Sequence, residues 1–81
     1  MVIKKQYVGK YDGLNRLTHY YMIQNDLHYG IELIQGDSQT ATSTYEWISD
    51  NEEQTLKLTQ LLCEHGASPI HLSEIIDNYM A

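Results

Sequence analysis

The segment Ser49–His65, SDNEEQTLKLTQLLCEH, marks the point where the chain changes from an alternating to a helical pattern. Ser49 or Asp50 can serve as the N-cap, and a glutamate follows three residues after each, as in a capping box. The apolar stripe that follows at helical spacing consists of Leu58, Leu61, Leu62 and His65, with Leu56 beside it. Gly66 suits the left-handed position that ends a helix. We therefore expect one helix over this segment.

A second helix is predicted shortly after Gly66. Ser68 can act as its N-cap, and Pro69 has the backbone angle that a first helical residue needs. Its apolar stripe has the i, i+3, i+4, i+7 spacing of a buried face and consists of Leu72, Ile75, Ile76 and Tyr79. Residues 49–81 are therefore predicted to form a helical hairpin.

Upstream of this hairpin, four segments alternate in the manner of strands. They are VIKKQYV at 2–8, RLTHYYMI at 16–23, LHYGIELI at 27–34 and TATSTYEWI at 40–48. Turn residues separate them, at 12–13, 25–26 and 36–38. Residues 1–48 therefore predict a four-stranded antiparallel meander. The whole chain, 1–81, is expected to be one α+β domain (ββββαα) in which the helical hairpin covers one face of the sheet.

The turns predict which strand residues face the helices, because a one-residue slip inverts every side chain. A two-residue turn at 25–26 gives a core face of Thr18, Tyr20, Met22, Tyr29, Ile31 and Leu33. In the next hairpin, a two-residue turn would add Thr40, Thr42, Thr44 and Glu46 to that face, whereas a three-residue loop adds Ala41, Ser43, Tyr45 and Trp47. We expect the three-residue loop, because it buries the aromatic rings. A turn at 12–13 brings Ile3 and Tyr7 to the core face as well.

The opposite face of the predicted sheet is apolar with interspersed His–Glu pairs. It shows Val2, Val8, Leu17, Tyr21, Ile23 and Ile34. The register sets His19 opposite Glu32 and His28 opposite Glu46. Such pairs are ordinary sheet stabilisers, and a weak zinc or ligand site on this face is the alternative. The spacings CxxC, HxxxH and HExxH are all lacking, so we expect no cofactor.

Cys63 and His65 lie two positions apart on the first predicted helix. Their side chains diverge at that spacing, so they cannot share a proton as a nucleophile and base do. A half-buried, unreactive thiol is the better prediction. A single cysteine also forms no internal disulfide, and the N-terminus shows no signal peptide. We therefore expect a cytoplasmic protein without a membrane span.

The charge of the chain is uneven. The formal net charge is −6, and residues 50–81 contribute six acids against one lysine, or −5. A DNA-reading helix–turn–helix needs cations for the phosphates and donors for the bases. The second predicted helix exposes Ser73, Glu74, Asp77 and Asn78 instead. Direct nucleic-acid binding by this hairpin is therefore not expected.

Three pieces of sequence resemble a family of short proteins from Gram-positive anaerobic bacteria that is known as a domain of unknown function. They are YGIEL at 29–33, the acidic start of the first helix, and ASPIHLSEIIDNYM at 67–80. The resemblance spans roughly residues 27–80. It implies a cytoplasmic bacterial protein from a mobile element or phage, and it carries over no catalytic residue.

The pattern as a whole favours a non-enzymatic interaction module, an adaptor or inhibitor that binds a protein. The first candidate surface is the hydroxyl-rich edge strand with Thr40, Thr42 and Thr44, which can accept a partner strand. The second is the apolar face with Tyr21, Ile23 and Ile34, which a protein partner or a second copy in a homodimer would cover. The alternative is a phage-borne, anti-defence inhibitor of a nucleic-acid-handling enzyme that uses the acidic helix residues Glu52, Glu53, Glu74 and Asp77.

Overall fold

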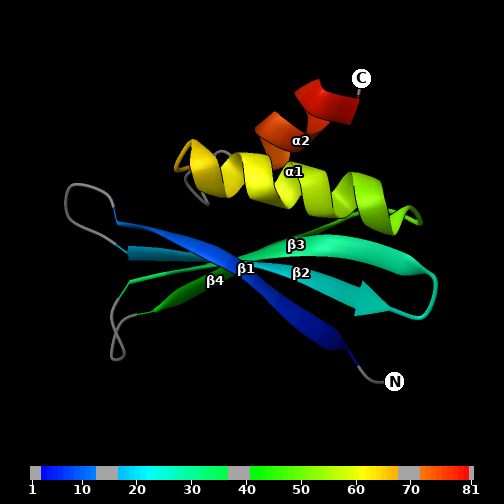
Figure 1. The fold of residues 1–81 in the computed structure, drawn as a ribbon, viewed down its shortest axis with the longest axis horizontal. Helices are drawn as coiled ribbons and strands as arrows, with labels where there is room; N and C mark the ends of the chain where they lie inside the picture. Colours follow the sequence, from blue (N-terminus) through cyan, green and yellow to red (C-terminus); the bar gives the residue numbers. More distant parts are fainter. Residues whose placement is uncertain (1–2, 13–16, 37–40, 68–71, 81) are drawn as a thin grey trace.

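The computed structural model describes residues 3–12, 17–36, 41–67 and 72–80, the last two by their backbone alone. Four strands precede two helices: β1 (Lys4–Asp12), β2 (Leu17–Asn25), β3 (His28–Gln35), β4 (Thr42–Ser49), α1 (Glu52–Glu64) and α2 (Leu72–Met80). The strands form one antiparallel sheet in the order β1-β2-β3-β4. Both helices lie on the same side of that sheet (Figure 1). The predicted α+β fold is confirmed.

β1 continues beyond the predicted segment 2–8 and ends at Asp12. A β-bulge at Val8 interrupts its pairing with β2, and the pairing resumes at Gly9. Before the bulge Tyr7 lies opposite Tyr21, and after it Gly9 lies opposite Tyr20. The extra residue lets Val8 pack against the core under the helices. The prediction that Tyr7 faces this core, and that Val8 faces away from it, was therefore wrong on both counts.

The β2–β3 pairing differs from the predicted register by two residues. The turn lies at Asp26–Leu27, so that Asn25 pairs with His28 and Tyr20 with Leu33. Asp26 has a φ of 50°, a left-handed conformation that aspartate tolerates better than most residues. A slip of two residues keeps every side chain on its predicted face, since strands have a period of two.

The β3–β4 hairpin contradicts the predicted three-residue loop. Gln35 pairs with Thr42 and Gly30 with Trp47, so an even number of residues separates the strands. Thr44 and Glu46 therefore lie on the helix side, opposite Leu33 and Ile31, and the residues predicted for the core lie on the other face. Those residues are Ser43, Tyr45 and Trp47.

The start of α1 also differs from the prediction. Asn51 is the N-cap, and its Oδ1 accepts a hydrogen bond from the Gln54 amide at 2.9 Å. Ser49, one of the predicted caps, instead accepts a hydrogen bond at Oγ from the Asn51 amide at 3.0 Å. The cap falls on Asn51 because Ser49 still pairs with Tyr29 at the end of β4.

The buried stripe of α1 consists of Thr55, Leu58, Thr59 and Leu62, whereas Leu61 is 41% exposed. The two threonines were missed because a hydroxyl usually disfavours burial. Here each hydroxyl donates to the carbonyl four residues earlier, Thr55 to Asn51 at 2.9 Å and Thr59 to Thr55 at 2.7 Å. The methyl groups are then free to pack against the sheet.

The end of α1 is the predicted glycine stop. Gly66 has a φ of 66° and donates to the Cys63 carbonyl, and Ala67 donates to the Leu62 carbonyl at 2.9 Å. These two bonds form a Schellman motif and turn the chain back toward the sheet. The predicted N-cap of α2, Ser68 with Pro69, lies outside the described residues.

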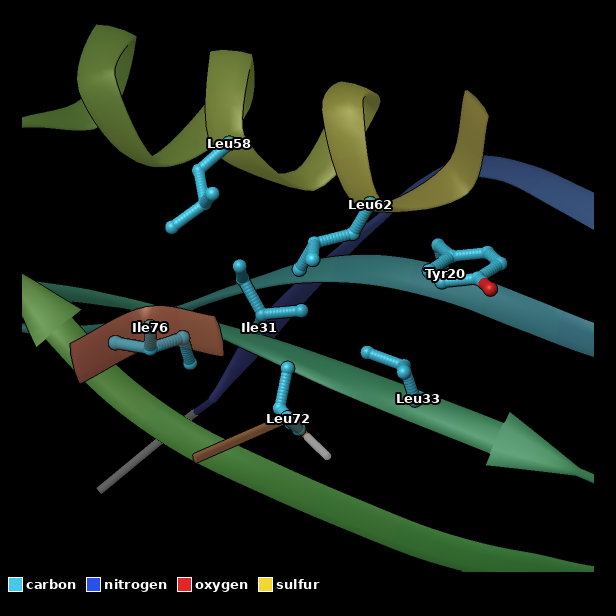
Figure 2. Packing of buried hydrophobic residues seen from close by; sticks show 7 residues of the cluster. All are labelled: Tyr20, Ile31, Leu33, Leu58, Leu62, Leu72 and Ile76. Atoms are coloured by element: carbon cyan, nitrogen blue, oxygen red, sulfur yellow. The ribbon is translucent and has the colours of Figure 1, made fainter. Parts of the chain in front are cut away.

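The core lies between the sheet and the two helices. Its buried members are Tyr20, Ile31, Leu33, Leu58, Leu62, Leu72 and Ile76. Figure 2 shows Leu58 and Leu62 pointing from α1 toward the sheet, and Leu72 and Ile76 closing the cluster from α2. The predicted stripe of α2 is confirmed for these two residues, while the side chain of Tyr79 lies outside the described part.

Tyr20 ties the sheet to the chain just after α1. Its hydroxyl donates to the Ala67 carbonyl at 2.7 Å, and the residue is fully buried. Burial, together with the weaker effect of Cys63, raises the pKa of Tyr20 from 10.0 to about 12. An unfolded tyrosine loses its proton at lower pH than Tyr20 does, so the folded state binds more protons between these two values.

Tyr20 should therefore make the protein less stable as pH rises from 10 to 12. Tyr20→Phe is expected to lower the free energy of unfolding by about 1–2 kcal/mol at pH 8, because the half-buried Ala67 carbonyl loses its partner. It should also flatten the loss of stability above pH 10. Urea unfolding at pH 8, 10 and 11 measures both effects. Tyr45→Phe, at an exposed ring, is the control, and equal alkaline slopes in wild type and Tyr20→Phe would contradict the assignment.

Candidate functional site

The sheet surface that faces away from the helices, here called the open face, is rich in aromatic side chains. Its rings come from three strands and are Tyr7, His19, Tyr21, Tyr45 and Trp47. Tyr7 packs edge-on against Tyr21, with ring centroids 5.2 Å apart, and Tyr45 packs against Trp47 at 6.3 Å. Edge-on pairs of this kind hold each ring in a defined orientation. The open face therefore carries two packed aromatic pairs.

A hollow of about 390 Å³ lies on the open face and spans the sheet from β1 to β4. Its lining residues are Ile3, Lys5, Ile23, Asn25, Glu32, Tyr45 and Trp47. Ile23 is 3% exposed, whereas Tyr45 is 58% exposed and Trp47 38%. The hollow thus combines a buried aliphatic residue with protruding aromatic ones. A concave, mainly apolar site with a few polar groups is the usual form of a binding pocket.

The polar side of the hollow is an ion pair that joins three strands. Lys5 Nζ on β1 lies 2.6 Å from Glu32 Oε1 on β3, and Ser43 Oγ on β4 donates to Glu32 Oε2 at 2.6 Å. Burial alone would raise the pKa of Glu32, but the hydrogen bonds and charge from Lys5, with the Ser43 hydrogen bond, outweigh it and lower that pKa. Glu32 is therefore an anion at neutral pH, with both its oxygens engaged.

Glu32 should contribute stability above its unfolded pKa and lose that contribution as pH falls through its lowered folded value. Lys5→Met is expected to lower the free energy of unfolding at pH 7 by about 0.5–1 kcal/mol, since Lys5 is half exposed and solvent screens the pair. As pH falls through the lowered folded pKa of Glu32, the carboxyl gains a proton and this difference should shrink. Urea unfolding at a series of pH values from 7 downward tests it. Lys57→Met, at the largely exposed pair with Glu53, is the control, and a Lys5→Met effect that stays constant across the series would refute the role of Glu32.

The structure does not bring together the predicted His–Glu pairs. His19 lies opposite Ile34, and its Nδ1 is 3.0 Å from the Tyr7 hydroxyl. Glu32 lies opposite Tyr21, and Glu46 is on the helix side of the sheet. The register shifts explain these errors. Within residues 3–12, 17–36, 41–67 and 72–80, no three or more His, Cys, Asp or Glu side chains are grouped as a metal ion requires.

Cys63 is half-buried, as predicted, and its Sγ donates weakly to the Lys10 carbonyl at 3.6 Å. Burial, followed by the charge of Glu64, raises the pKa of this thiol above 9.0. The thiolate is the reactive form, so Cys63 is mainly the unreactive thiol at neutral pH.

The residues predicted to bind a partner fall on three different surfaces. Tyr21, Ile23 and Ile34 lie on the open face, as expected, together with Leu17. Thr42 and Thr44 belong to β4, which is an edge of the sheet, while Thr40 and Val2 lie outside the described residues. The acidic residues Glu52, Glu53, Glu74 and Asp77 are exposed on the two helices.

The sequence analysis missed two exposed rings of the open face, Tyr45 and Trp47. A signal for them was present in Gly30. A Cβ at Gly30 would lie 2.5 Å from the Glu46 carbonyl oxygen and 3.0 Å from Trp47 Cε3. Only glycine lets Trp47 cross so closely over β3, and that contact fixes the ring on the open face.

Comparisons with known proteins bear on the family alone. Neither described helix is long and apolar enough to cross a bilayer. Neither the curated proteins nor the solved structures contain a match to the chain. A family model does match, over residues 1–81, and it describes a family of unknown function, DUF6514. The chain therefore belongs to this family of unknown function.

Proposed function

We propose that this protein is a small non-enzymatic interaction module, an adaptor or inhibitor that binds a partner protein with the open face of its sheet. The observation that carries the proposal is the exposure of Tyr45 and Trp47 beside the hollow that Ile23 lines. Tyrosine and tryptophan are the residues that most often dominate binding energy in protein interfaces. The two rings pack edge-on against each other, and a pair that is already arranged loses less conformational entropy on binding than two separate side chains do.

The shape of the hollow supports an apolar anchor from the partner. Ile3 and Trp47 offer aliphatic and aromatic contacts, while the Lys5–Glu32 pair offers polar contacts at one side. A leucine, methionine or aromatic side chain fits a site of this size and composition. The surrounding hydroxyls of Ser43 and the tyrosines suit the polar rim of such an interface.

A site-specific photo-cross-linker tests this proposal in the native host. Benzoylphenylalanine at position 45 is expected to capture a discrete protein, whereas the same group at Gln60, which is exposed on α1, should not capture it. Calorimetry with that purified protein should then show Tyr45→Ala and Trp47→Ala binding about thirtyfold more weakly, a hot-spot effect of about 2 kcal/mol. Leu61→Ala, on the helix side, should bind normally. Equal capture from positions 45 and 60, or normal affinity in both aromatic variants, would refute the proposal.

A further inference from the structure

The two edges of the sheet are protected to very different extents. β1 carries Lys4, Lys5 and Lys10 and is bent by the bulge at Val8. Lysines and bulges are the usual means by which proteins stop an edge strand from pairing with another chain. β4, which the structure describes in full, has a single charged residue, Glu46, and pairs regularly with β3 from Thr42 to Trp47, before a bulge at Ile48. Among the described residues no strand pairs with the outer side of β4, so its backbone groups from Thr42 to Trp47 are available to a further strand.

We propose that β4 accepts an extended segment of the partner protein as a fifth strand, and that this segment alternates apolar residues with lysine or arginine. This inference rests on the proposed function and specifies the chemistry of the partner. Strand addition supplies affinity through main-chain hydrogen bonds, and alternate side chains supply specificity. Each face of β4 therefore determines what the added strand must carry at every second residue.

The side of β4 on the open face favours apolar residues in the added strand. Tyr45 and Trp47 are two residues apart, on the same side, and are both exposed. Side chains directly across an added antiparallel pair would lie about 5 Å away from them. Valine, isoleucine or an aromatic residue at these positions would remove both rings from water, whereas a charged residue would lose its hydration against them.

The side of β4 that faces the helices favours lysine or arginine in the added strand. Glu46 is half-buried there, opposite Ile31. α2 contacts β4 on this side. Residues 50–81 carry a charge of −5 in sequence. A lysine or arginine opposite Glu46 therefore meets complementary charge.

The same charges disfavour a second copy of the chain at this edge. Antiparallel pairing of β4 with its own copy would place both helix layers on the same side of a continuous sheet. Glu46 of each copy would then lie on that same side of the joined sheet, and each chain has a net charge of −6. Like charges in this arrangement repel, so a cationic partner strand is favoured over a homodimer.

Fluorescence anisotropy with synthetic peptides tests the inference on the full chain. The first probe is a labelled octapeptide of alternating valine and lysine, and the second replaces every lysine with glutamate. Wild-type protein should bind the lysine peptide at least about tenfold more tightly than the glutamate peptide, and Glu46→Lys should reduce this preference about tenfold. A third probe, the lysine peptide with an N-methyl group on every backbone amide, keeps all charges but has no main-chain donor with which to pair as a strand, and it should not bind.

Three results would overturn the inference. They are equal binding of the N-methylated peptide, equal binding of the glutamate peptide, and sedimentation of the free protein as a dimer that Thr44→Lys dissociates. Circular dichroism of Glu46→Lys verifies that the variant is folded. These failures are distinguishable from failure of the proposed function. If cross-linking at position 45 still captures a Trp47-dependent partner while the peptides do not bind, the open face binds its partner without strand addition.

Discussion

Gly30→Ala is expected to lower the free energy of unfolding by about 3 kcal/mol, at the upper end of what overpacking usually costs. The new methyl group would lie 2.5 Å from the carbonyl oxygen of Glu46. That atom belongs to the backbone of β4, so the contact can be relieved only by separating β3 from β4. Trp47 must move as well, because its Cα would be 3.1 Å from the methyl group.

Fluorescence measures this displacement directly, since Trp47 is the single tryptophan in the chain. The Gly30→Ala variant should show red-shifted emission and stronger acrylamide quenching, together with the loss of stability in urea. Gly9→Ala is the matched control. Its Cβ would lie 2.9 Å from Cys63 Sγ, a side-chain atom, and far from Trp47 in the sheet order. Unchanged emission and stability in Gly30→Ala would show that β3 and β4 do not approach so closely.

Leu62→Ala is expected to destabilise the protein by about 2–5 kcal/mol, because it leaves a cavity in the core between α1 and the sheet. Leu62 is 3% exposed and belongs to the buried cluster with Tyr20 and Ile31. An 81-residue domain has a total stability of about 4–12 kcal/mol by its size, so this loss would remove a substantial share of the total.

The neighbouring residue provides the control. Leu61→Ala makes the same chemical change one position earlier, at a side chain that is 41% exposed, and should change stability by less than about 1 kcal/mol. Urea unfolding gives the loss of stability in both variants. The predicted stripe, which included both leucines, implies similar losses, whereas the observed stripe implies a large loss only for Leu62→Ala. Equal losses in the two variants would mean that α1 is rotated about its axis relative to the structure described here.

The faces of β2 and β3 could be predicted from the sequence because their alternation is unambiguous. Tyr20 on β2 and Ile31 on β3 each belong to an alternating set of mainly apolar residues, and the register that buries one set also buries the other. The two-residue error in register had no effect on these faces. The helices were likewise predictable, since leucine and isoleucine at helical spacing and a glycine stop act locally.

The face of β4 could not be predicted in the same way. One of its alternating sets contains the rings of Tyr45 and Trp47, and the other contains mainly threonine. Burial of the two rings removes more apolar area from water, so a comparison of apolar area alone favoured the wrong face. The outcome depends on the close passage of Trp47 over Gly30 and on Ile48, which packs against the core from the helix side. These are contacts between strands, and the alternation of one strand contains no information about them. The candidate site was therefore only half predicted, with Ile23 and Tyr21 found and its exposed rings placed inside.

The order of the sheet, β1-β2-β3-β4, also affects how the molecule folds. Every strand pairs with a neighbour in the chain, so the sheet can assemble from hairpins that each form in about 1–10 μs. During synthesis these hairpins leave the ribosome first, with Tyr20 and Leu33 still uncovered. Two hydrogen bonds of long sequence separation, from Tyr20 to Ala67 and from Cys63 to Lys10, span 47 and 53 residues. They form when α1 docks on the sheet. Docking converts a solvated sheet of marginal stability into a domain with a buried core.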